Sequence, residues 1–373
     1  MAKLGEVCKV SASTKMIDKS KAWLLNLDMV EQQTGRVVEY NFVGEDGLNG
    51  SITQFDTENV LYSKLRPNLN KVVLPERDGF CTSELLPLRP DARKLDRSYL
   101  AVFLRSDGFV NWAVSKTAGA KMPRLGTKDL LNANIPLPEI KEQKAIAEKF
   151  KKSEELISLR KQQLVKMDEL VKARFFEMFG DISNSRKVPM QDVCKIITDG
   201  THQPPKFVLS GIPFLFVSNI VTNEIHYDAE KFISEETYNE LIKRTPIEVG
   251  DVLLSTVGSY GHPAVVKENK PFCFQRHIAY LKPNNSVVNS EYLRCAILST
   301  DLQRQIDESV KGIAQKTLNL SEIRKLRLPL PSLSLQNQFA AFVERIDQQK
   351  QTVQQSLEKL ELMKKALMQE YFG

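Results

Sequence analysis

The sequence predicts an α+β protein made of two tandem halves, each a globular segment followed by a long α-helix. Three observations support this prediction. The second part of the chain repeats the first, at a constant offset over its last third, and each repeat contains a long run without glycine or proline. The stretches before these runs mix strand-like and helix-like segments. A repeat this long is the size of a whole domain, so it indicates a domain duplication and not a solenoid.

The repeat is clearest around two proline-rich turns. IPLPEIKEQKAIAEKF from Ile135 aligns with LPLPSLSLQNQFAAFV from Leu328, an offset of 193 residues. This offset holds without a gap over 125–180 and 318–373, and shorter echoes occur upstream, such as LGEVCKV and MQDVCKI. We therefore expect halves of about 1–180 and 186–373, joined by the polar segment DISNSR.

The run after each proline-rich turn predicts a long helix. Positions spaced alternately four and three apart are mainly apolar in both runs, and the other positions are mostly charged or glutamine. This heptad pattern, sustained for more than four heptads, is typical of a coiled-coil seam. The predicted packing residues are Ile146, Phe150, Ile157, Leu164 and Val171 in the first helix and Phe339, Val343, Val353, Leu357 and Leu360 in the second.

Two such helices in one chain most simply pack on each other. Each would be roughly 50 Å long at 1.5 Å per residue, so together they would hold two globular domains at a fixed separation. Such spacing suits a ligand with a fixed repeat of its own. The alternative is a coiled coil that serves only oligomerisation.

The globular segments are predicted at 1–117 and 186–309, and the helical regions at 118–180 and 310–373. Strand-like runs include NVLYSKL, PFLFVSNI, DVLLSTV and RHIAYLKP, and short helical runs include DRSYLAVFLRS and SEYLRCAILST. Turn-forming residues separate them, which favours a mixed domain in each half.

Composition narrows the class of protein. A formal charge of +6 gives a weak preference for polyanions. The five cysteines are odd in number and form no C-x-x-C pair, so we expect buried free thiols and neither a disulfide framework nor a zinc site. The N-terminus lacks the apolar core of a signal peptide, and no stretch of about 18 apolar residues occurs. We expect a cytoplasmic protein that does not enter a membrane.

Motifs for catalysis are missing from the sequence. It has no phosphate-binding loop, no G-x-G-x-x-G and no G-x-S-x-G, and its four histidines lack metal-ligand spacing. The segment QPPK from Gln203 differs at both outer positions from the Asn-Pro-Pro-Tyr motif of amino-methyltransferases. The sequence therefore favours a binding protein, in which no metal or cofactor is held by this chain.

Polar loops suggest the class of ligand. LYSKLRPNLNK from Leu61 carries cations and amides in a turn-rich stretch, and STVGSYGH from Ser255 occupies the equivalent place in the other half with small hydroxyls and glycines. Such groups suit phosphate positioning and base-edge recognition, and glycine permits close backbone approach to a ligand. Solvated loop charges are the alternative for each single residue.

Along essentially its whole length, the chain resembles the specificity subunit of type I restriction–modification systems. The resemblance rests on WLLNLDMVEQQTG, LYSKLRPNLNKVVLP, TDGTHQPP, GIPFLFVSNI and GDVLLSTVGSYG, and on the two helical arms after the PLP turns. No one stretch is diagnostic, but their order together with the duplication is specific.

The resemblance implies a mechanism of targeting. Each half would hold a target recognition domain that reads one half of a split site on double-stranded DNA. The two helices would pack antiparallel as a spacer, and the halves would be related by a pseudo-two-fold axis. The chain would carry no catalytic residues. It would recruit two modification subunits, which use S-adenosylmethionine to methylate adenine, and in the full enzyme two ATP-driven restriction subunits.

Two further expectations concern the DNA site. The segment WLLNLD has no counterpart in 186–309, and TDGTH has none near Ser11, so the two half-sites should differ and the target should be asymmetric. The two long helices would set the distance between the globular domains, so the half-sites should lie about one helical turn of DNA apart.

The predicted DNA contacts fall on loops and at the junctions before the PLP turns, where a basic residue could contact phosphate or merely cap the junction. They are Lys64, Arg66, Asn68, Lys121 and Arg124 in the first half, and Thr201, His202, Asn219, Ser255, Ser259, Tyr260, Arg276 and Lys316 in the second.

Two other functions remain open from the sequence. A fused enzyme would methylate DNA by itself, which the missing cofactor and nuclease motifs argue against. A coiled-coil dimerisation scaffold would form a salt-independent homodimer and would not retain DNA.

Overall fold

The computed structural model describes residues 1–17, 22–44, 47–48, 50–119, 121–180, 187–312 and 316–373. The predicted linker DISNSR lies outside the described residues. The chain divides into two compact units, here called unit 1 (1–162 with 354–373) and unit 2 (163–353). The predicted domain boundaries stay predictions.

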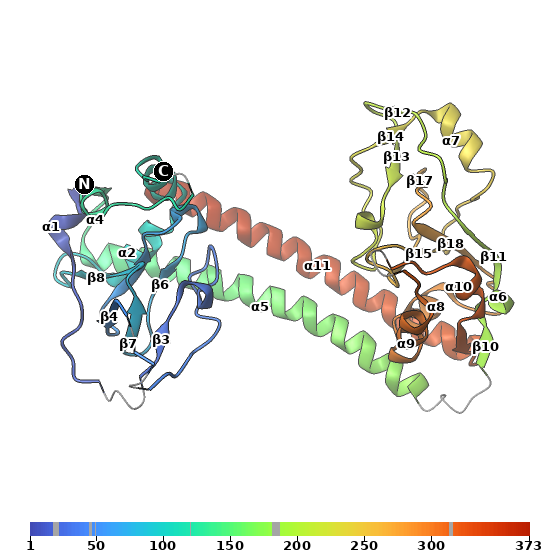
Figure 1. The fold of residues 1–373 in the computed structure, drawn as a ribbon, viewed down its shortest axis with the longest axis horizontal. Helices are drawn as coiled ribbons and strands as arrows, with labels where there is room; N and C mark the ends of the chain where they lie inside the picture. The colour runs from blue at the N-terminus through green and yellow to red at the C-terminus, as the bar shows by residue number, and fades with distance from the viewer. Residues whose placement is uncertain (18–21, 45–46, 49, 120, 181–186, 313–315) are drawn as a thin grey trace. The chain divides into compact units, whose positions relative to one another are not determined.

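Unit 1 holds two main sheets (Figure 1), besides the short antiparallel pair formed by β1 and β9. The larger is antiparallel in the order β2-β8-β5-β6 and the smaller has the order β3-β7-β4. The strands are β1 (Ala2–Lys3), β2 (Cys8–Val10), β3 (Leu24–Leu25), β4 (Ile52–Phe55), β5 (Val60–Ser63), β6 (Val72–Val73), β7 (Gly79–Thr82), β8 (Leu85–Pro90) and β9 (Asn134–Ile135). The helices are α1 (Leu4–Val7), α2 (Arg97–Leu104), α3 (Asp107–Ser115) and α4 (Thr127–Leu131), with single 3-10 turns η2 (Leu27–Met29) and η3 (Pro67–Leu69).

Unit 2 repeats the larger sheet in the order β11-β18-β15-β16, beside a four-stranded sheet β12-β14-β13-β17. The strands are β10 (Lys187–Pro189), β11 (Cys194–Asp199), β12 (Phe207–Val208), β13 (Ile212–Leu215), β14 (Phe232–Ile233), β15 (Val252–Ser255), β16 (Pro263–Val265), β17 (Cys273–Phe274), β18 (Ile278–Pro283) and β19 (Arg327–Pro329). The helices are α6 (Met190–Val193), α7 (Glu235–Leu241), α8 (Ser290–Ile297), α9 (Thr300–Ser309) and α10 (Leu320–Lys325), with η5 (Val217–Asn219).

Local sequence explains the elements that the two units share. β5 and β15 each consist of three largely apolar residues followed by a serine and are buried at every position, as expected of strands covered on both faces. α2 and α8 begin after Asp96 and Asn289, whose side chains accept hydrogen bonds from the first free backbone N–H groups. These four elements confirm strands and helices predicted from the sequence.

A buried glutamine fixes the start of each long helix to its globular domain. The Gln143 amide accepts from the Asp96 N–H at 2.9 Å and donates to the carbonyls of Lys94 and Pro138. Gln336 repeats these contacts at the same offset of 193 residues, with Asn289 N–H at 2.8 Å and the carbonyls of Val287 and Pro331. Both glutamines are fully buried. The duplication therefore preserves this polar clasp as well as the apolar core.

The long helices are α5 (Ile140–Phe179) and α11 (Leu333–Phe372), each of 40 residues. At 1.5 Å per residue each is about 60 Å long, more than the sequence suggested, because the helix begins directly after the proline turn. The ten predicted packing residues are all buried or half-buried, while most positions between them are exposed. The heptad seam is thus the face that each helix buries.

The two helices pack antiparallel within each unit. In unit 1 the first half of α5 meets the last part of α11, where Lys364 bonds Glu154 at 2.8 Å and Phe150 packs on Phe372. In unit 2 the end of α5 meets the beginning of α11, where Lys350 bonds Asp168 at 2.9 Å. The predicted fold, two α+β halves with an antiparallel helix pair, is confirmed.

A phenylalanine at the end of each helix completes a core. Phe372 packs on Tyr99 and Phe103 in unit 1, and Phe179 packs on Tyr292 and Phe339 in unit 2. Each helix therefore starts in one unit and packs its last phenylalanine against the core of the other.

Candidate nucleic-acid interface

In unit 1 the structure brings the predicted loop and junction residues together. The Leu125 N–H donates to the Lys64 carbonyl at 2.9 Å, and the Arg66 N–H donates to the Pro123 carbonyl at 2.8 Å. Two backbone hydrogen bonds between Ala118 and Arg124 close the junction into a short hairpin. Lys64, Arg66, Asn68, Lys121 and Arg124 therefore lie on two segments that are joined through the backbone.

The loop after β5 is held in a shape that keeps two of its side chains exposed. Arg66 and Asn70 adopt left-handed backbone conformations, with φ of 48° and 49°, on either side of η3. Asn70 is buried and donates to the Arg105 carbonyl, which anchors the turn. Arg66 and Asn68 are exposed and Lys64 is half-exposed.

The cations of this cluster differ in their partners. Glu84 accepts from Arg124 Nε at 3.1 Å and from Nη2 at 2.9 Å, and this hydrogen-bonded carboxylate raises the pKa of Arg124. Within the described part of the chain, no carboxylate forms an ion pair with Lys64, Arg66 or Lys121. Their charge is therefore available to a polyanion, whereas Arg124 is partly neutralised.

Unit 2 repeats the same construction after β15. The Gly258 N–H donates to the Lys316 carbonyl at 3.2 Å, and the Leu318 N–H donates to the Thr256 carbonyl at 2.8 Å. The ammonium of Lys316 lies 6.0 Å from the centroid of the Tyr260 ring, and the Tyr260 hydroxyl donates to Asp307 at 3.0 Å. The exposed Ser259 hydroxyl lies 3.2 Å from the His262 ring. Gln315 of the predicted junction lies outside the described residues.

The segment after β11 adds the remaining predicted contacts of unit 2. The Arg276 N–H donates to the Thr201 carbonyl at 3.0 Å, and the Thr256 N–H donates to the His277 carbonyl at 2.9 Å. A Cβ on Gly200 would lie 2.2 Å from the Phe274 carbonyl oxygen, so only glycine allows this approach. Thr201, His202 and Arg276 therefore lie beside the loop that carries Ser259 and Tyr260.

Two predicted contacts are side chains that hold loops instead. Asn219 is 9% exposed, and its amide bonds the backbone of Phe216, His226 and Asp228. Ser255 is fully buried and accepts from the His262 N–H at 2.9 Å. Because their polar atoms are satisfied inside the domain, neither side chain is presented to a ligand.

One cation of this cluster was not predicted. Arg244 follows α7 and lies within 3.5 Å of His202, 42 residues away along the chain. Its sequence neighbours carry no motif, so only the folded chain identifies it. Its partner Asp199, which ends β11, was also missed.

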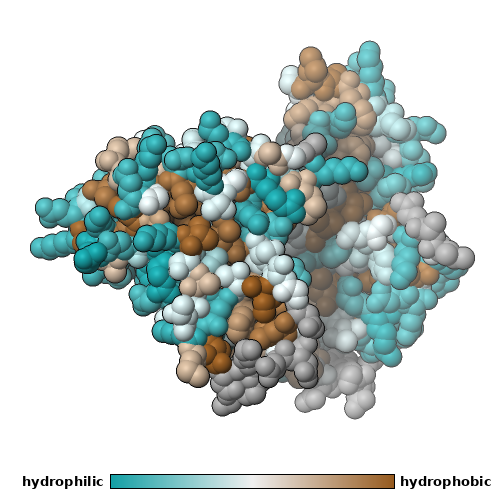
Figure 2. Space-filling view, turned by 60° about the vertical axis from the view of Figure 1, so that its left-hand side comes forward, coloured by the Kyte–Doolittle hydropathy of each residue, from teal (hydrophilic) through white to brown (hydrophobic). Residues whose placement is uncertain are grey.

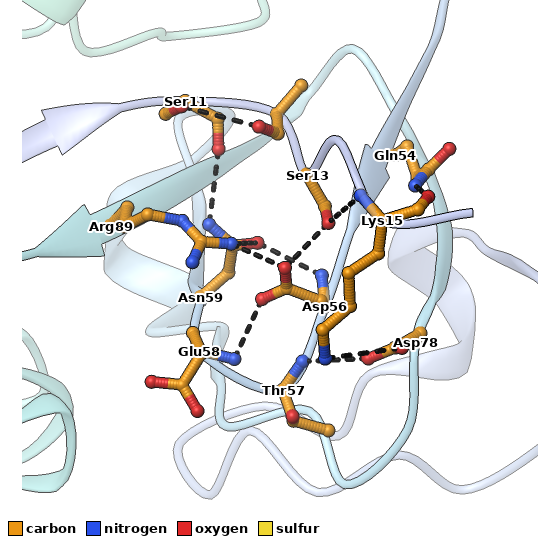
Figure 3. Close-up of polar contacts among 11 residues, drawn as sticks. Ser11, Ser13, Lys15, Gln54, Asp56, Thr57, Glu58, Asn59, Asp78 and Arg89 are labelled. Atoms are coloured by element: carbon orange, nitrogen blue, oxygen red, sulfur yellow. Dashed lines mark hydrogen bonds and ion pairs between the residues drawn. The ribbon is translucent and has the colours of Figure 1, made fainter. Parts of the chain in front are cut away.

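A dense polar cluster elsewhere in unit 1 resembles a site but serves the fold (Figure 3). Asp56 accepts from Ser13 at 2.6 Å, from Arg89 at 2.5 Å and from the Glu58 N–H at 2.9 Å. Burial alone would raise the pKa of Asp56, but these donors outweigh it and the pKa is lowered.

Unit 2 contains a similar cluster at the same place in its larger sheet. Lys282, which stands 193 residues after Arg89, pairs with Glu248 at 2.8 Å and with Asp251 at 3.6 Å. The turn before β15 is closed by an Asp251 carboxylate that accepts from the Glu248 N–H at 2.8 Å. Because both units keep this arrangement while their loops differ, we assign it a structural role.

We expect Asp56→Ala to destabilise unit 1 by about 2 kcal/mol, since it leaves Ser13 and the Glu58 N–H without their acceptor and Arg89 without its carboxylate. The value is reduced because the Arg89 side chain is 34% exposed. Chemical denaturation measures the loss. Asp91→Ala, which removes the carboxylate paired with the exposed Arg93, is the matched control and should change stability little.

No other chemistry emerges from the described residues. Among them no group of three or more His, Cys, Asp or Glu side chains is placed to hold a metal ion. Burial raises the pKa of the Cys8 and Cys81 thiols to about 12, so both stay protonated at neutral pH. Among the same residues, no helix has the length and apolar character needed to cross a bilayer.

The chain is similar to known proteins in both sequence and fold. A family model described as "Type I restriction modification DNA specificity domain" matches residues 1–168 and 183–362. A chain from a solved structure, described under complex assembly and conformational transition of the type I R-M system, aligns with a TM-score of 0.62 and 20% identity. The alignment covers 100% of this chain and 96% of that chain, and it shows the shared fold.

Two curated relatives from Escherichia coli match parts of the chain. The type I restriction enzyme EcoDI specificity subunit is 31% identical over 117 residues, which are 31% of this chain and 26% of the relative. The EcoBI specificity subunit is 23% identical over 269 residues, which are 64% of this chain and 56% of the relative. The matches therefore span about a quarter and just over half of the lengths of these relatives. Because the family model covers most of both halves, the chain belongs to the type I restriction modification DNA specificity domain family.

Proposed function

We propose that this chain is the DNA-sequence specificity subunit of a type I restriction–modification enzyme. In this role it reads a bipartite, asymmetric site on double-stranded DNA and carries no catalytic residues of its own. The observation that carries the proposal is the loop cluster found at the same place in both units, with exposed cations on backbone-linked loops. Cations position DNA through its phosphates, and loop side chains reach the base edges.

The differences between the units support an asymmetric target. Among the described residues, unit 2 has α7 and a second sheet of four strands, whereas the second sheet of unit 1 has three strands. The loop after β5 offers Lys64 and Arg66, whereas the loop after β15 offers Ser259 and Tyr260. Different side chains on the same scaffold would select different half-sites.

Exposed apolar residues on the long helices provide a surface for partner subunits. Leu362 is 67% exposed and Met363 59% exposed in unit 1, and Leu170 is 48% exposed and Phe176 74% exposed in unit 2. On the face shown in Figure 2, apolar residues are interspersed among hydrophilic ones. Leu170 and Met363 are equivalent in the repeat. Each unit would thus dock one of two identical modification subunits.

Those partners would supply the chemistry. S-adenosylmethionine would be bound by the modification subunits, which methylate adenine, and ATP by two restriction subunits where the complete enzyme contains them. This chain would contribute binding and positioning only.

Methylation mapping tests the proposal. The chain is co-expressed with the modification subunit, and methyladenine is located across host DNA by long-read sequencing. We expect a split, asymmetric motif with a fixed gap of unread bases. Methylation that is absent, or unchanged when this chain is omitted, would leave the dimerisation scaffold as the better account.

A domain exchange extends this test. Replacing residues 1–117 with the corresponding segment of another specificity subunit should change one half of the motif and leave the other half intact. A motif that changes in both halves would contradict the assignment of one half-site to each unit.

A further inference from the structure

Asp199 of unit 2 holds two side chains at the end of β11. Its Oδ1 accepts from Arg244 Nη2 at 2.5 Å, and its Oδ2 lies 3.0 Å from His202 Nε2. The Asp199 side chain is only 12% exposed, whereas Arg244 is 52% and His202 51% exposed. A nearly buried carboxylate therefore fixes two side chains that are themselves about half exposed.

The anchor is itself rigid. Asp199 is paired with Ala279 in the larger sheet, and the next residue, Gly200, lies against the Phe274 carbonyl. The following Thr201 is bonded to the strand-linking turn through the Arg276 N–H. The sheet thus fixes the position of the Asp199 carboxylate, and the carboxylate in turn positions the side chains of Arg244 and His202.

From this arrangement we infer that Arg244 and His202 together read the major-groove edge of a G·C base pair in the half-site of unit 2. The inference rests on the proposed function and names the base pair that this part of the interface selects.

The hydrogen-bonding groups match that base pair. A guanidinium has five N–H donors, and in the described chain Asp199 is the one acidic partner of Arg244, so donors remain for guanine N7 and O6. In the tautomer whose Nε2 proton is directed at Asp199, Nδ1 of His202 is an acceptor. An acceptor beside two donors complements the N4 amino group of cytosine beside guanine O6 and N7.

A phosphate contact fits this group less well. A phosphate beside Arg244 would also approach the Asp199 carboxylate, and two negative charges at short range repel each other. Guanine N7 and O6 are neutral acceptors and avoid that repulsion. Lys64 and Arg66, which have no acidic partner among the described residues, are better suited to phosphate.

The location also fits a selective role. Arg244 follows α7, which belongs to the part of unit 2 that differs from unit 1, whereas the larger sheet is common to both. A residue that selects one half-site is expected in the segment that differs.

The test compares three variants in the complex with the modification subunit. Arg244→Ala removes the donors. Arg244→Lys keeps the charge and the partner of Asp199 but cannot make two parallel hydrogen bonds. Arg304→Ala is the control, because Arg304 is also exposed in unit 2 and also pairs with an aspartate through Nη2, at 3.0 Å.

We expect the wild-type motif to contain a G·C pair in the half-site of unit 2. Binding to duplexes in which that pair is replaced by A·T should show a preference of roughly ten- to a hundredfold for G·C. Arg244→Ala and Arg244→Lys should reduce the preference to near equality at that position alone. Arg304→Ala should keep the full motif.

The outcomes separate the inference from the proposed function. A wild-type chain that directs no methylation refutes the proposed function before any variant is scored. A wild-type motif that both Arg244 variants retain, or a second half-site without a G·C pair, overturns the inference alone. If Arg244→Ala abolishes binding altogether, Arg244→Lys decides, because a retained motif overturns the inference and a relaxed one supports it.

Discussion

Replacing Gln336 with leucine is expected to lower the free energy of unfolding of unit 2 by about 3–5 kcal/mol. Leucine keeps the volume but removes one acceptor and two donors from a fully buried position. The Asn289 N–H and the carbonyls of Val287 and Pro331 then lose their partner. Each buried polar group without a partner costs about 1–3 kcal/mol, and their costs are not additive.

Chemical denaturation followed by circular dichroism measures the effect. Gln349→Leu is the matched control, since Gln349 lies on the same helix and is exposed. Gln143→Leu should produce a similar loss in unit 1, because the clasp there has the same three contacts. If Gln336→Leu is no more destabilising than Gln349→Leu, the clasp does not hold the helix to the domain.

DNA affinity is expected to fall about a thousandfold when monovalent salt rises from about 50 to 200 mM. The loop clusters carry Lys64, Arg66 and Lys121 in unit 1 and Arg276 and Lys316 in unit 2, and engaging about six phosphates gives this dependence. The slope of the logarithm of affinity against the logarithm of salt concentration measures the number of phosphates.

Single substitutions measure how much each lysine contributes to this salt dependence. Lys121→Ala and Lys316→Ala should each reduce the slope by about one and weaken binding to all sequences alike. Lys141→Ala, an exposed lysine at the start of α5, is the control. A slope near zero would contradict DNA binding through the phosphates and favour the salt-independent scaffold.

The elements that could be predicted from the sequence are those with a strong local pattern. The seam of α5 and α11 follows from heptad spacing, and β5 and β15 follow from short apolar runs. Asp96 and Asn289 are ordinary N-cap residues ahead of a helical pattern. Local interactions dominate in these segments, so the tertiary structure agrees with them.

The predicted interface was less complete because burial and proximity depend on the whole fold. Ser255 looked like a loop hydroxyl, but it is the last residue of a strand covered on both faces. Asn219 closes a turn that no local pattern distinguishes from an exposed one. Asp199 and Arg244 are 45 residues apart, and nothing in either segment indicates that they pair. Reasoning by residue type therefore found the loops but not every side chain that they present.

Because α11 ends against the core of unit 1, the residues of the two units are completed at different points during synthesis. Unit 2 is continuous over 163–353, so all of its residues have been made once the ribosome passes that point. Unit 1 also requires residues 354–373. The ring of Phe150 packs on Phe372, which is synthesised 222 residues later. Until then the rings of Tyr99, Phe103 and Phe150 lack part of their cover, and transiently exposed apolar surface of this kind makes incompletely folded chains prone to aggregation. The unit whose first residues are translated first is therefore the one whose residues are completed last.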